Sequence, residues 1–342
     1  MRRDKNAIRA AGAAAALCLM LTACSGSADA TGATGAGEPV VRQGVYTSHL
    51  PLDLPVIIAK DQGLFKKHGV SVELTDIQTG TDMVTAIISK SIDVGNPATP
   101  PGLVVFTQQG ADLGALAGGT KLDFRVLVPT KTSVPGSGAS MADRLATLKG
   151  KTVMVIGTGT LTDWWFRDAV KSAGLGPKDI NIIAATNVSG QIAAFKAGKA
   201  DAVVAFGTLP GLIGEEGKDY EVLMGIPEGH TGSRYDSYLQ TFVAATHAWQ
   251  KKNGKTVDKY CAALAEATSW LSEKSNHAAA VDAMAQWTKL PKDKAEDLLE
   301  TTVYKMKLDP ENWREQGDTI GESKAMDFTR DVNDGCSSQF AQ

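Results

Sequence analysis

The chain is 342 residues long, 43% hydrophobic and 21% charged, with 35 basic and 38 acidic residues and a formal net charge of −3. A chain of this length can bury two cores of ordinary domain size. The lack of a basic excess argues against a nucleic-acid partner. The composition is neither that of a disordered chain nor that of a collagen.

The first 23 residues have the anatomy of an export signal. Four basic residues precede an apolar run at 10–21, which is too short to span a bilayer comfortably. The run ends in the tetrapeptide LTAC, which resembles the bacterial lipobox, and this resemblance implies that Cys24 becomes the lipidated first residue of the mature protein. An ordinary signal peptide followed by a chance cysteine is the alternative. Cleavage before Cys24 removes four basic residues and one acidic residue and leaves a net charge of −6.

Residues 24–37 are small and polar, with too little apolar surface to fold, so we expect a flexible tether. The folded part then begins near Glu38. These features predict a bacterial lipoprotein that works outside the cytoplasm and is held to the cell membrane by its lipid.

Two cysteines remain once Cys18 is assigned to the signal and Cys24 to the lipid. Cys261 and Cys336 are an even pair in an oxidising compartment, and a disulfide between them would contribute roughly 4 kcal/mol on the chain-entropy estimate. Two unrelated buried thiols are the alternative. The sequence holds no CxxC or HExxH motif and few histidines, so we expect no metal site.

From residue 40 onward, predicted strands alternate with predicted helices. In the first half the strands are 40–46, 70–77, 92–95, 115–117 and 124–128, and the helices are 55–68, 82–90 and 101–109. A loop rich in Gly, Ser and Pro follows at 130–140. In the second half the strands are 152–156, 180–185, 202–205 and 221–224, and the helices are 141–148, 163–173, 190–197 and 209–216. The remainder is mostly helical, at 256–274, 276–288, 292–303 and 311–330.

Strands separated by helices predict mainly parallel sheets with helices on both faces, which is an α/β fold. The alternation occurs twice. Asp93 and Asp201 lie 108 positions apart, and each follows a helix and begins a short buried strand. This repeat is weak evidence by itself, because an Asp before a small apolar residue is common.

The segment GTGT at 157–160 leads from a predicted strand into a predicted helix. It lacks the third glycine of a dinucleotide-binding fingerprint, because position 162 is Thr162. The backbone N–H groups and hydroxyls at the helix start could hold an anionic or strongly polar group. The alternative is that Thr160 or Thr162 merely caps the helix. At most one of Trp164 and Trp165 is expected to cover an apolar part of a ligand, with the other in the core.

Several segments together resemble the solute-binding proteins of nitrate/sulfonate/taurine ABC transporters. They are 54–76, which contains a Gly-x-Phe-x-x-x-Gly pattern at 63–69, then 85–95, 148–152 and 194–202. The second departs from the family pattern, which has Gly before the Asp-containing strand. The resemblance implies a type II periplasmic-binding-protein-like fold, with two α/β lobes joined by two crossing segments. It also implies that Asp93 and Asp201 belong to equivalent elements.

The resemblance divides the folded part into 38–129 plus 240–342 for lobe 1, which includes the C-terminal helices, and 130–239 for lobe 2. The crossings are expected near 128–131 and 235–240. Loops at the carboxyl ends of the strands should line the cleft, although His49 is expected to pack at its mouth and Arg125 to pair on the surface. The candidate ligand-binding residues are Ser48, His49, Gly80, Thr81, Asn96, Thr99, Gly157, Thr158, Gly159, Thr160, Trp164, Phe206 and Thr208.

The implied function is that of a non-catalytic, monomeric substrate-binding component of an ABC importer, without cofactor. It would capture a small organic anion, a sulfonate or a carboxylate with or without an aromatic body, and deliver it to a membrane permease by hinge closure. One alternative is an enzyme like the thiamine-pyrimidine synthases, which resemble this family but are cytosolic and use a His as substrate. Another is a sensory lipoprotein that presents its ligand to a membrane kinase.

Overall fold

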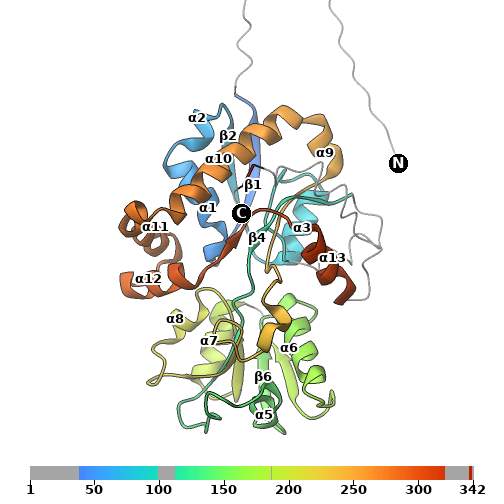
Figure 1. The fold of residues 1–342 in the computed structure, drawn as a ribbon, viewed down its shortest axis with the longest axis vertical. Helices are drawn as coiled ribbons and strands as arrows, with labels where there is room; N and C mark the ends of the chain where they lie inside the picture. The colour runs from blue at the N-terminus through green and yellow to red at the C-terminus, as the bar shows by residue number, and fades with distance from the viewer. Residues whose placement is uncertain (1–37, 99–111, 186, 320–338, 341–342) are drawn as a thin grey trace, which may run out of the picture. The chain divides into compact units, whose positions relative to one another are not determined.

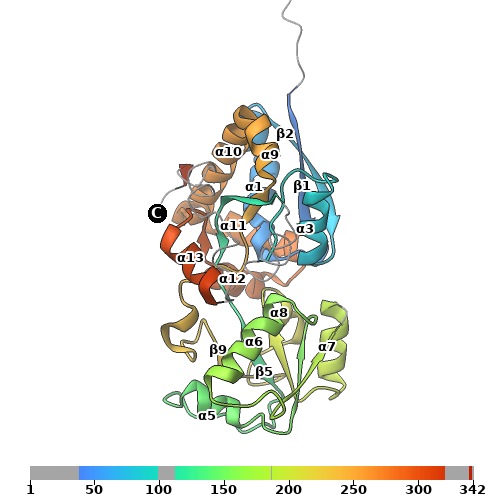
Figure 2. The same ribbon diagram turned by 90° about the vertical axis from the view of Figure 1, so that its right-hand side faces the viewer.

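Two groups of strands, each flanked by helices, organise the protein (Figures 1 and 2). The computed structural model describes residues 38–98, 112–185, 187–319 and 339–340, and all structural statements below concern this part of the chain. The predicted features that lie outside it are the export signal at 1–23, Cys24 and the tether at 24–37, Thr99, the helix at 101–109, the end of the helix at 311–330, and Cys336. We call the group that contains the first strand lobe 1 and the other group lobe 2.

Lobe 1 is built on a strip of short strands. These are β1 (Val40–Tyr46), β2 (Ser71–Ile77), β3 (Gly114–Ala117), β4 (Gly119–Thr120), β10 (Val243–Ala245) and β11 (Tyr304–Lys305). β1 and β2 pair in parallel along their whole length, β10 pairs antiparallel with β3, and β11 pairs antiparallel with β4. Single bridges from Val94 to β1 and from Gly95 to β10 join the first two pairs. The chain therefore returns to lobe 1 after it has built lobe 2.

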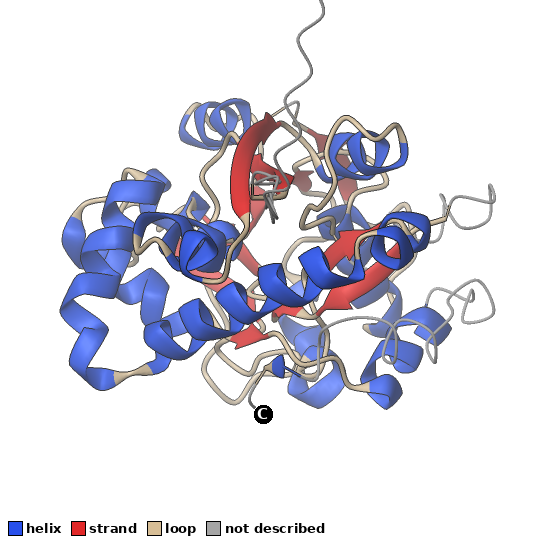
Figure 3. Cartoon of the chain, turned by 90° about the horizontal axis from the view of Figure 1, so that it is seen from above, coloured by secondary structure: helices blue, strands red, loops and turns tan. Residues whose placement is uncertain are grey.

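Helices lie on both sides of these strands, as the view from above shows (Figure 3). They are η1 (Pro51–Asp53), α1 (Leu54–Asp61), α2 (Leu64–Lys67), α3 (Gly80–Ile88), α9 (His247–Lys252), α10 (Gly254–Ser272), η3 (Lys274–Asn276), α11 (His277–Thr288), α12 (Lys292–Thr301) and α13 (Pro310–Thr319). None of the helices described is both long enough and apolar enough to cross a membrane.

The Gly-x-Phe-x-x-x-Gly pattern has a backbone reason. Gly63 and Gly69 flank the short helix α2 and have φ angles of 69° and 74°, a region that residues with a Cβ adopt at a cost. Between them Phe65 is buried and stacks on Tyr260 of α10, with ring centroids 5.4 Å apart. The two glycines thus let the chain turn sharply at each end of α2 while Phe65 anchors it to the core.

Lobe 2 is a five-stranded sheet in the order β7-β6-β8-β5-β9. Its strands are β5 (Arg125–Val128), β6 (Thr152–Val155), β7 (Asn181–Ala184), β8 (Ala202–Ala205) and β9 (Glu221–Gly225). Its helices are α5 (Met141–Ala146), α6 (Leu161–Ser172), α7 (Val188–Lys196), α8 (Leu209–Ile213) and η2 (Gly232–Tyr235). β7, β6 and β8 are parallel, whereas β5 runs antiparallel to both of its neighbours. The predicted α/β fold is therefore confirmed, with one antiparallel strand inside the second sheet.

The position of β5 corrects the predicted lobe boundary. The sequence assigned 124–128 to lobe 1, but β5 pairs with β8 and β9 of lobe 2. The crossing segments meet where Leu122 donates its N–H to the carbonyl of Tyr238, at 3.1 Å, and Lys121 bridges to Leu239. The first crossing thus lies before Arg125 rather than at 128–131. A buried strand such as 124–128 fits either sheet, so its composition could not assign it.

The repeat around Asp93 and Asp201 is structural. A carboxylate oxygen of Asp93 accepts the backbone N–H of Arg42 at the start of β1 (2.9 Å), and the N–H of Asp93 donates to the Arg42 carbonyl (2.8 Å). Asp201 makes the same pair of bonds with Thr152 at the start of β6, both at 2.8 Å. Each Asp thereby satisfies a backbone donor that would otherwise be left without a partner at the start of its sheet.

Candidate functional site

A cavity of about 590 Å³ lies among loops of both lobes, within the range typical of small-molecule sites. Lobe 1 and the crossing segments supply Tyr46, Thr47, Ser48, Leu50, Leu52, Gln78, Thr79, Gly80, Thr81, Ala98, Phe124, Gln240 and Thr241 to its lining. Lobe 2 supplies Ile156, Gly157, Gly159, Thr160, Leu161, Thr162, Ala185, Asn187, Val188, Ser189 and Phe206. No Asp, Glu, Lys, Arg or His is among these described lining residues.

Three helices begin at this cavity. Their N-cap residues, which are Thr79 for α3, Thr160 for α6 and Asn187 for α7, all line it, and so do the first two residues of each helix. The first N–H groups of a helix have no acceptor within the helix, and the helix dipole makes this end partly positive. The cavity is therefore surrounded by backbone donors that carry partial positive charge.

The start of α6 partly distinguishes the two interpretations of the GTGT segment, an anion-binding helix start and a threonine N-cap. The Thr160 side chain makes no capping bond to the helix; its hydroxyl donates to the Gly157 carbonyl at 2.7 Å. Asp163 accepts the N–H of Gly159 at 2.9 Å and pairs with Arg167 at 2.7 Å. Asp163 thus holds the loop from behind, while the N-terminal end of α6 still faces the cavity.

An apolar wall completes the cavity. Phe124 and Phe206 pack edge to face with centroids 6.1 Å apart, one on each side of the seam between the crossing segment and lobe 2. Leu50, Leu52 and Tyr46 continue this wall in lobe 1. The arrangement offers polar donors for one end of a ligand and apolar surface for the rest.

A buried carboxyl group lies directly behind the lobe 1 wall. Asp53 accepts the backbone N–H of Tyr46 (2.9 Å) and the side-chain amide of Asn96 (3.0 Å). Burial raises the pKa of Asp53 from 3.8 to about 7, and these two hydrogen bonds oppose the shift without cancelling it. Asp53 does not itself line the cavity, but its hydrogen-bond partner Tyr46 does.

Seven of the thirteen candidate residues line the cavity: Ser48, Gly80, Thr81, Gly157, Gly159, Thr160 and Phe206. Five others lie elsewhere: His49, Asn96, Thr158, Trp164 and Thr208. The last, Thr99, lies outside the described residues. That the seven bind a ligand remains a prediction.

The residues outside the lining have identifiable places. His49 packs against Trp287 of α11 with tilted rings whose centroids are 4.5 Å apart, and it does not line the cavity. Asn96 is buried against Asp53. Trp165 is fully buried in the core, as expected for one of the pair, and Trp164 packs partly buried against the same core rather than in the cavity. Helix periodicity alone could not predict that neither tryptophan lines the cavity.

The start of α7 was missed from the sequence. Asn187 accepts the N–H of Gly190 at 2.8 Å, so the helix begins at Val188 rather than at 190. An Asn three residues before the predicted helix, directly after a strand, was the signal for an N-cap at the cleft edge. Gln78 and Thr79, which follow β2, carried the same signal for α3.

A second cavity, of about 170 Å³, is lined by residues of α8, β9 and α12 among others. It differs in character, because its lining includes the charged residues Arg125, Glu216, Glu228, Lys294 and Asp297. Arg125 pairs there with Glu228, with the nitrogen and oxygen 2.5 Å apart. Arg125 is thus engaged in an ion pair away from the larger cavity.

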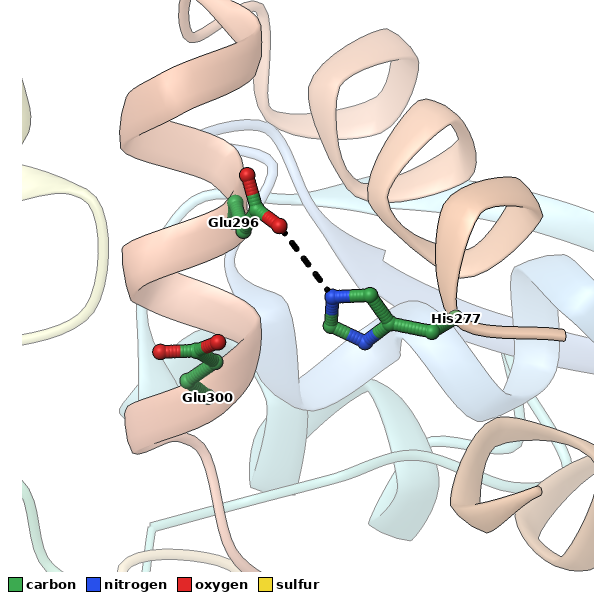
Figure 4. Close-up of side chains that lie close together, drawn as sticks. All are labelled: His277, Glu296 and Glu300. Carbon is green, nitrogen blue, oxygen red and sulfur yellow. Dashed lines mark hydrogen bonds and ion pairs between the residues drawn. The ribbon is translucent and has the colours of Figure 1, made fainter. Parts of the chain in front are cut away.

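One cluster among the described residues has the chemistry of metal ligands. His277 of α11 and Glu296 of α12 form an ion pair at 3.2 Å, and Glu300 lies one turn further along α12 (Figure 4). All three side chains are exposed and none lines the larger cavity. A surface ion pair accounts for this cluster.

Cys261 is buried and disulfide-bonded. Its pairing with Cys336 stays a prediction, because Cys336 lies outside the described residues.

Two sheet-based lobes joined by crossing segments, with a cavity between their loops, define the periplasmic-binding-protein fold. Comparison with solved structures agrees. The alkanesulfonate-binding protein SsuA of Xanthomonas axonopodis pv. citri, bound to MOPS, matches with a TM-score of 0.67 and 20% identity over 85% of this chain and 96% of that one. SsuA of Escherichia coli matches at 0.64 and 22%, over 86% and 96%. The nitrate-binding protein NrtA of Synechocystis PCC 6803 matches at 0.66 and 18%, over 88% and 85%.

The chain belongs to the NMT1/THI5-like family, whose model matches residues 51–278. The matched span begins at η1 and ends in α11, so it covers all of lobe 2 and the cavity-lining residues from Leu52 onward. No curated protein matches the sequence significantly.

Proposed function

We propose that the protein is the substrate-binding component of an ABC importer and that its cavity captures a small organic anion, a sulfonate or a carboxylate. One observation carries the proposal: three helix N-termini meet at a cavity whose described lining holds no charged side chain. An anion there is held by backbone donors and helix dipoles, each contributing about 0.3–1 kcal/mol, and up to about 2 kcal/mol where partly buried.

The size of the cavity favours an organic anion over a bare inorganic one. A volume of about 590 Å³ leaves space beyond an anionic head group, and the wall formed by Phe124, Phe206 and Leu52 can cover an apolar body. The structural neighbours include proteins that bind alkanesulfonates and nitrate. Of these two ligand classes, the alkanesulfonate fits the apolar wall better.

Ligand capture would proceed by closure of the two lobes. The segments that join them touch at Leu122 and Tyr238, so a rotation there changes the distance between the loops of the two lobes. An anion that contacts α3 from one side and α6 and α7 from the other stabilises the closed form. The closed form is then the one that docks on the membrane permease.

The proposal includes export and lipid anchoring. Residues 1–23 would be removed, Cys24 would carry the lipid, and residues 24–37 would tether a monomeric binding domain outside the cytoplasm. Mass spectrometry of the membrane-derived protein tests this: the expected N-terminal peptide begins with a lipidated Cys24. The same non-reduced digest is expected to contain a peptide pair joined through Cys261 and Cys336. An unmodified N-terminus would contradict the anchor, and free Cys336 would contradict the pairing.

An enzymatic role is the second candidate, because the family model that matches is named for NMT1 and THI5. A synthase of the kind that consumes its own histidine would need a His in the cavity. None of the described lining residues is a His. His49 lies between the lining residues Ser48 and Leu50 in the sequence, but its ring packs against Trp287. Release of a new product, with loss of protein mass, would favour the enzyme.

A sensory lipoprotein is a further candidate and would bind the same ligand. The presence of a permease gene beside this one distinguishes import from sensing.

A thermal-shift screen against alkanesulfonates, aromatic sulfonates, carboxylates and nitrate tests the binding proposal. Organic anions are expected to raise the midpoint of unfolding by mass action, and nitrate less so. If no anion raises the midpoint, the ligand assignment fails.

The position of the anion is tested by Ser189→Asp, with Ser189→Asn as the matched neutral control. Ser189 is exposed, lines the cavity and is the second residue of α7, where an acidic residue suits the helix dipole, so the variant should fold. A charge about 4 Å from the bound anion costs about 4 kcal/mol at an effective dielectric constant of about 20. Because Asp can rotate toward water, we expect at least a roughly tenfold loss of affinity for the Asp variant only. Equal affinities of the two variants would place the anion elsewhere.

A further inference from the structure

We infer that the cavity excludes ligands that carry a cationic group, so that the substrate is an anion whose remainder is uncharged. This inference rests on the proposed function and narrows it, because amino-substituted sulfonates and amino acids would be rejected although they carry the same anionic head.

The described lining provides no carboxylate as a partner for a cation. A buried ammonium group loses its hydration and needs a carboxylate or a set of free acceptors in return. None of the described residues that line the cavity is Asp or Glu. Residues 99–111, which follow the lining residue Ala98 in the chain, contain no charged residue.

Two carboxylates behind the lining are already engaged by the protein's own donors. Asp163 accepts from Gly159 and pairs with Arg167, and it is nearly buried. Asp53 accepts from the backbone of Tyr46 and from Asn96. Both groups serve the protein's own donors, so neither is available to a ligand ammonium without breaking the loops that form the cavity.

The three helix N-termini also disfavour a cationic group in the cavity. The three N-terminal ends that attract an anion repel a cation placed near them. In a short zwitterion the ammonium lies only a few bonds from the anionic head, so it remains close to these ends. The competing possibility is a cation–π contact with Phe124 or Phe206, which would hold the ammonium against the apolar wall. The two possibilities predict opposite ligand preferences.

Calorimetric titration of the purified protein with two matched probes decides between them. The probes are propane-1-sulfonate and 3-aminopropane-1-sulfonate, which differ by one ammonium group. We expect the amino compound to bind at least about 30-fold more weakly at pH 7. Its N-acetyl derivative, which keeps the nitrogen but loses the charge, should recover most of the affinity. Equal or tighter binding of the amino compound would overturn the inference and leave the binding function standing. Failure of all the anions would overturn the proposed function itself.

A pair of isosteric variants tests the physical cause. Gln240→Glu places a carboxylate on the cavity in a crossing segment rather than at a helix start, and it should reduce the difference in affinity between the two probes at least about fivefold. Gln78→Glu places one directly before the N-cap of α3, where it should weaken both probes to a similar extent. If Gln240→Glu leaves the ratio unchanged while the protein still binds propane-1-sulfonate, the lack of a carboxylate is not the reason for the preference.

Discussion

The buried Asp53 gives the protein a stability that depends on pH. It lies behind the cavity wall, is fully buried, and accepts hydrogen bonds from the Tyr46 backbone and the Asn96 side chain. Asp53→Asn removes the titrating group and nearly preserves the shape. The new amide oxygen can still accept from Tyr46, and a half-turn of the Asn96 amide would offer its oxygen, which has no hydrogen-bond partner among the described residues, to the new amide nitrogen.

The direction and size of this pH dependence follow from the pKa of Asp53. Burial raises the pKa of Asp53 from 3.8 to about 7. Between about pH 4 and pH 7 the unfolded chain has released this proton and the folded chain keeps it, so stability falls as pH rises through this range. At about 1.4 kcal/mol for each pKa unit, the loss amounts to about 4 kcal/mol as an upper bound. Above pH 7 the group is ionised in both states and the loss is complete.

Urea unfolding of wild type and Asp53→Asn at pH 4.5, 6 and 8 measures this effect. The difference in unfolding free energy should move in favour of the variant by about 2–4 kcal/mol from the lowest to the highest pH. Asp76→Asn, at an exposed position on β2, controls for the change in net charge and should show no such trend. Parallel pH profiles of wild type and Asp53→Asn would refute the reasoning.

Substitutions at Gly207 and Arg144 test the packing between the lobes and within lobe 2, respectively, with Gly217→Ala as a control. Gly207→Ala and Gly217→Ala both force a Cβ into a left-handed backbone, with φ of 52° and 78°, at a cost of about 1 kcal/mol. Of the two, only the new carbon at Gly207 would meet a neighbour, the Pro51 side chain at 3.2 Å. Gly207→Ala should therefore lower the free energy of unfolding in urea by about 1 kcal/mol more than Gly217→Ala. Equal losses would contradict tight packing between Gly207 and Pro51. Arg144→Met should lower the free energy of unfolding by about 3 kcal/mol, because the buried guanidinium donates to the Leu223 carbonyl at 3.0 Å. Arg144→Lys should not restore this stability. A near-neutral effect would show that water replaces the guanidinium.

The division into two lobes came from the resemblance to a solute-binding family, whereas the alternation of apolar and amphipathic segments was sufficient to predict the α/β fold, because strand and helix periods differ clearly. It did not assign β5 to its sheet, since a four-residue strand such as Arg125–Val128, buried apart from its first residue, has no face pattern that identifies its neighbours. The Asp93 and Asp201 repeat was visible in the sequence. Its meaning, a shared pair of backbone hydrogen bonds, became visible only with the partners Arg42 and Thr152.

Positions that line the cavity were predictable where a loop follows a strand and contains small or hydroxylated residues, as at Gly157, Gly159 and Thr160. It was not predictable where the side chain's direction decides the outcome. His49 follows Ser48 directly, yet Ser48 lines the cavity and His49 turns to Trp287. The apolar wall escaped prediction because residues such as Leu52 are indistinguishable in sequence from ordinary core residues.

The most direct test of the account is the crystal structure of the protein with its best-binding organic anion. The account predicts that the anionic head lies within hydrogen-bond distance of backbone N–H groups at the starts of α3, α6 and α7, at Thr81, Thr162 and Ser189, with the ligand body against Phe124 and Phe206. A head group held by a charged side chain, or a ligand bound in the smaller cavity at Arg125, would contradict it.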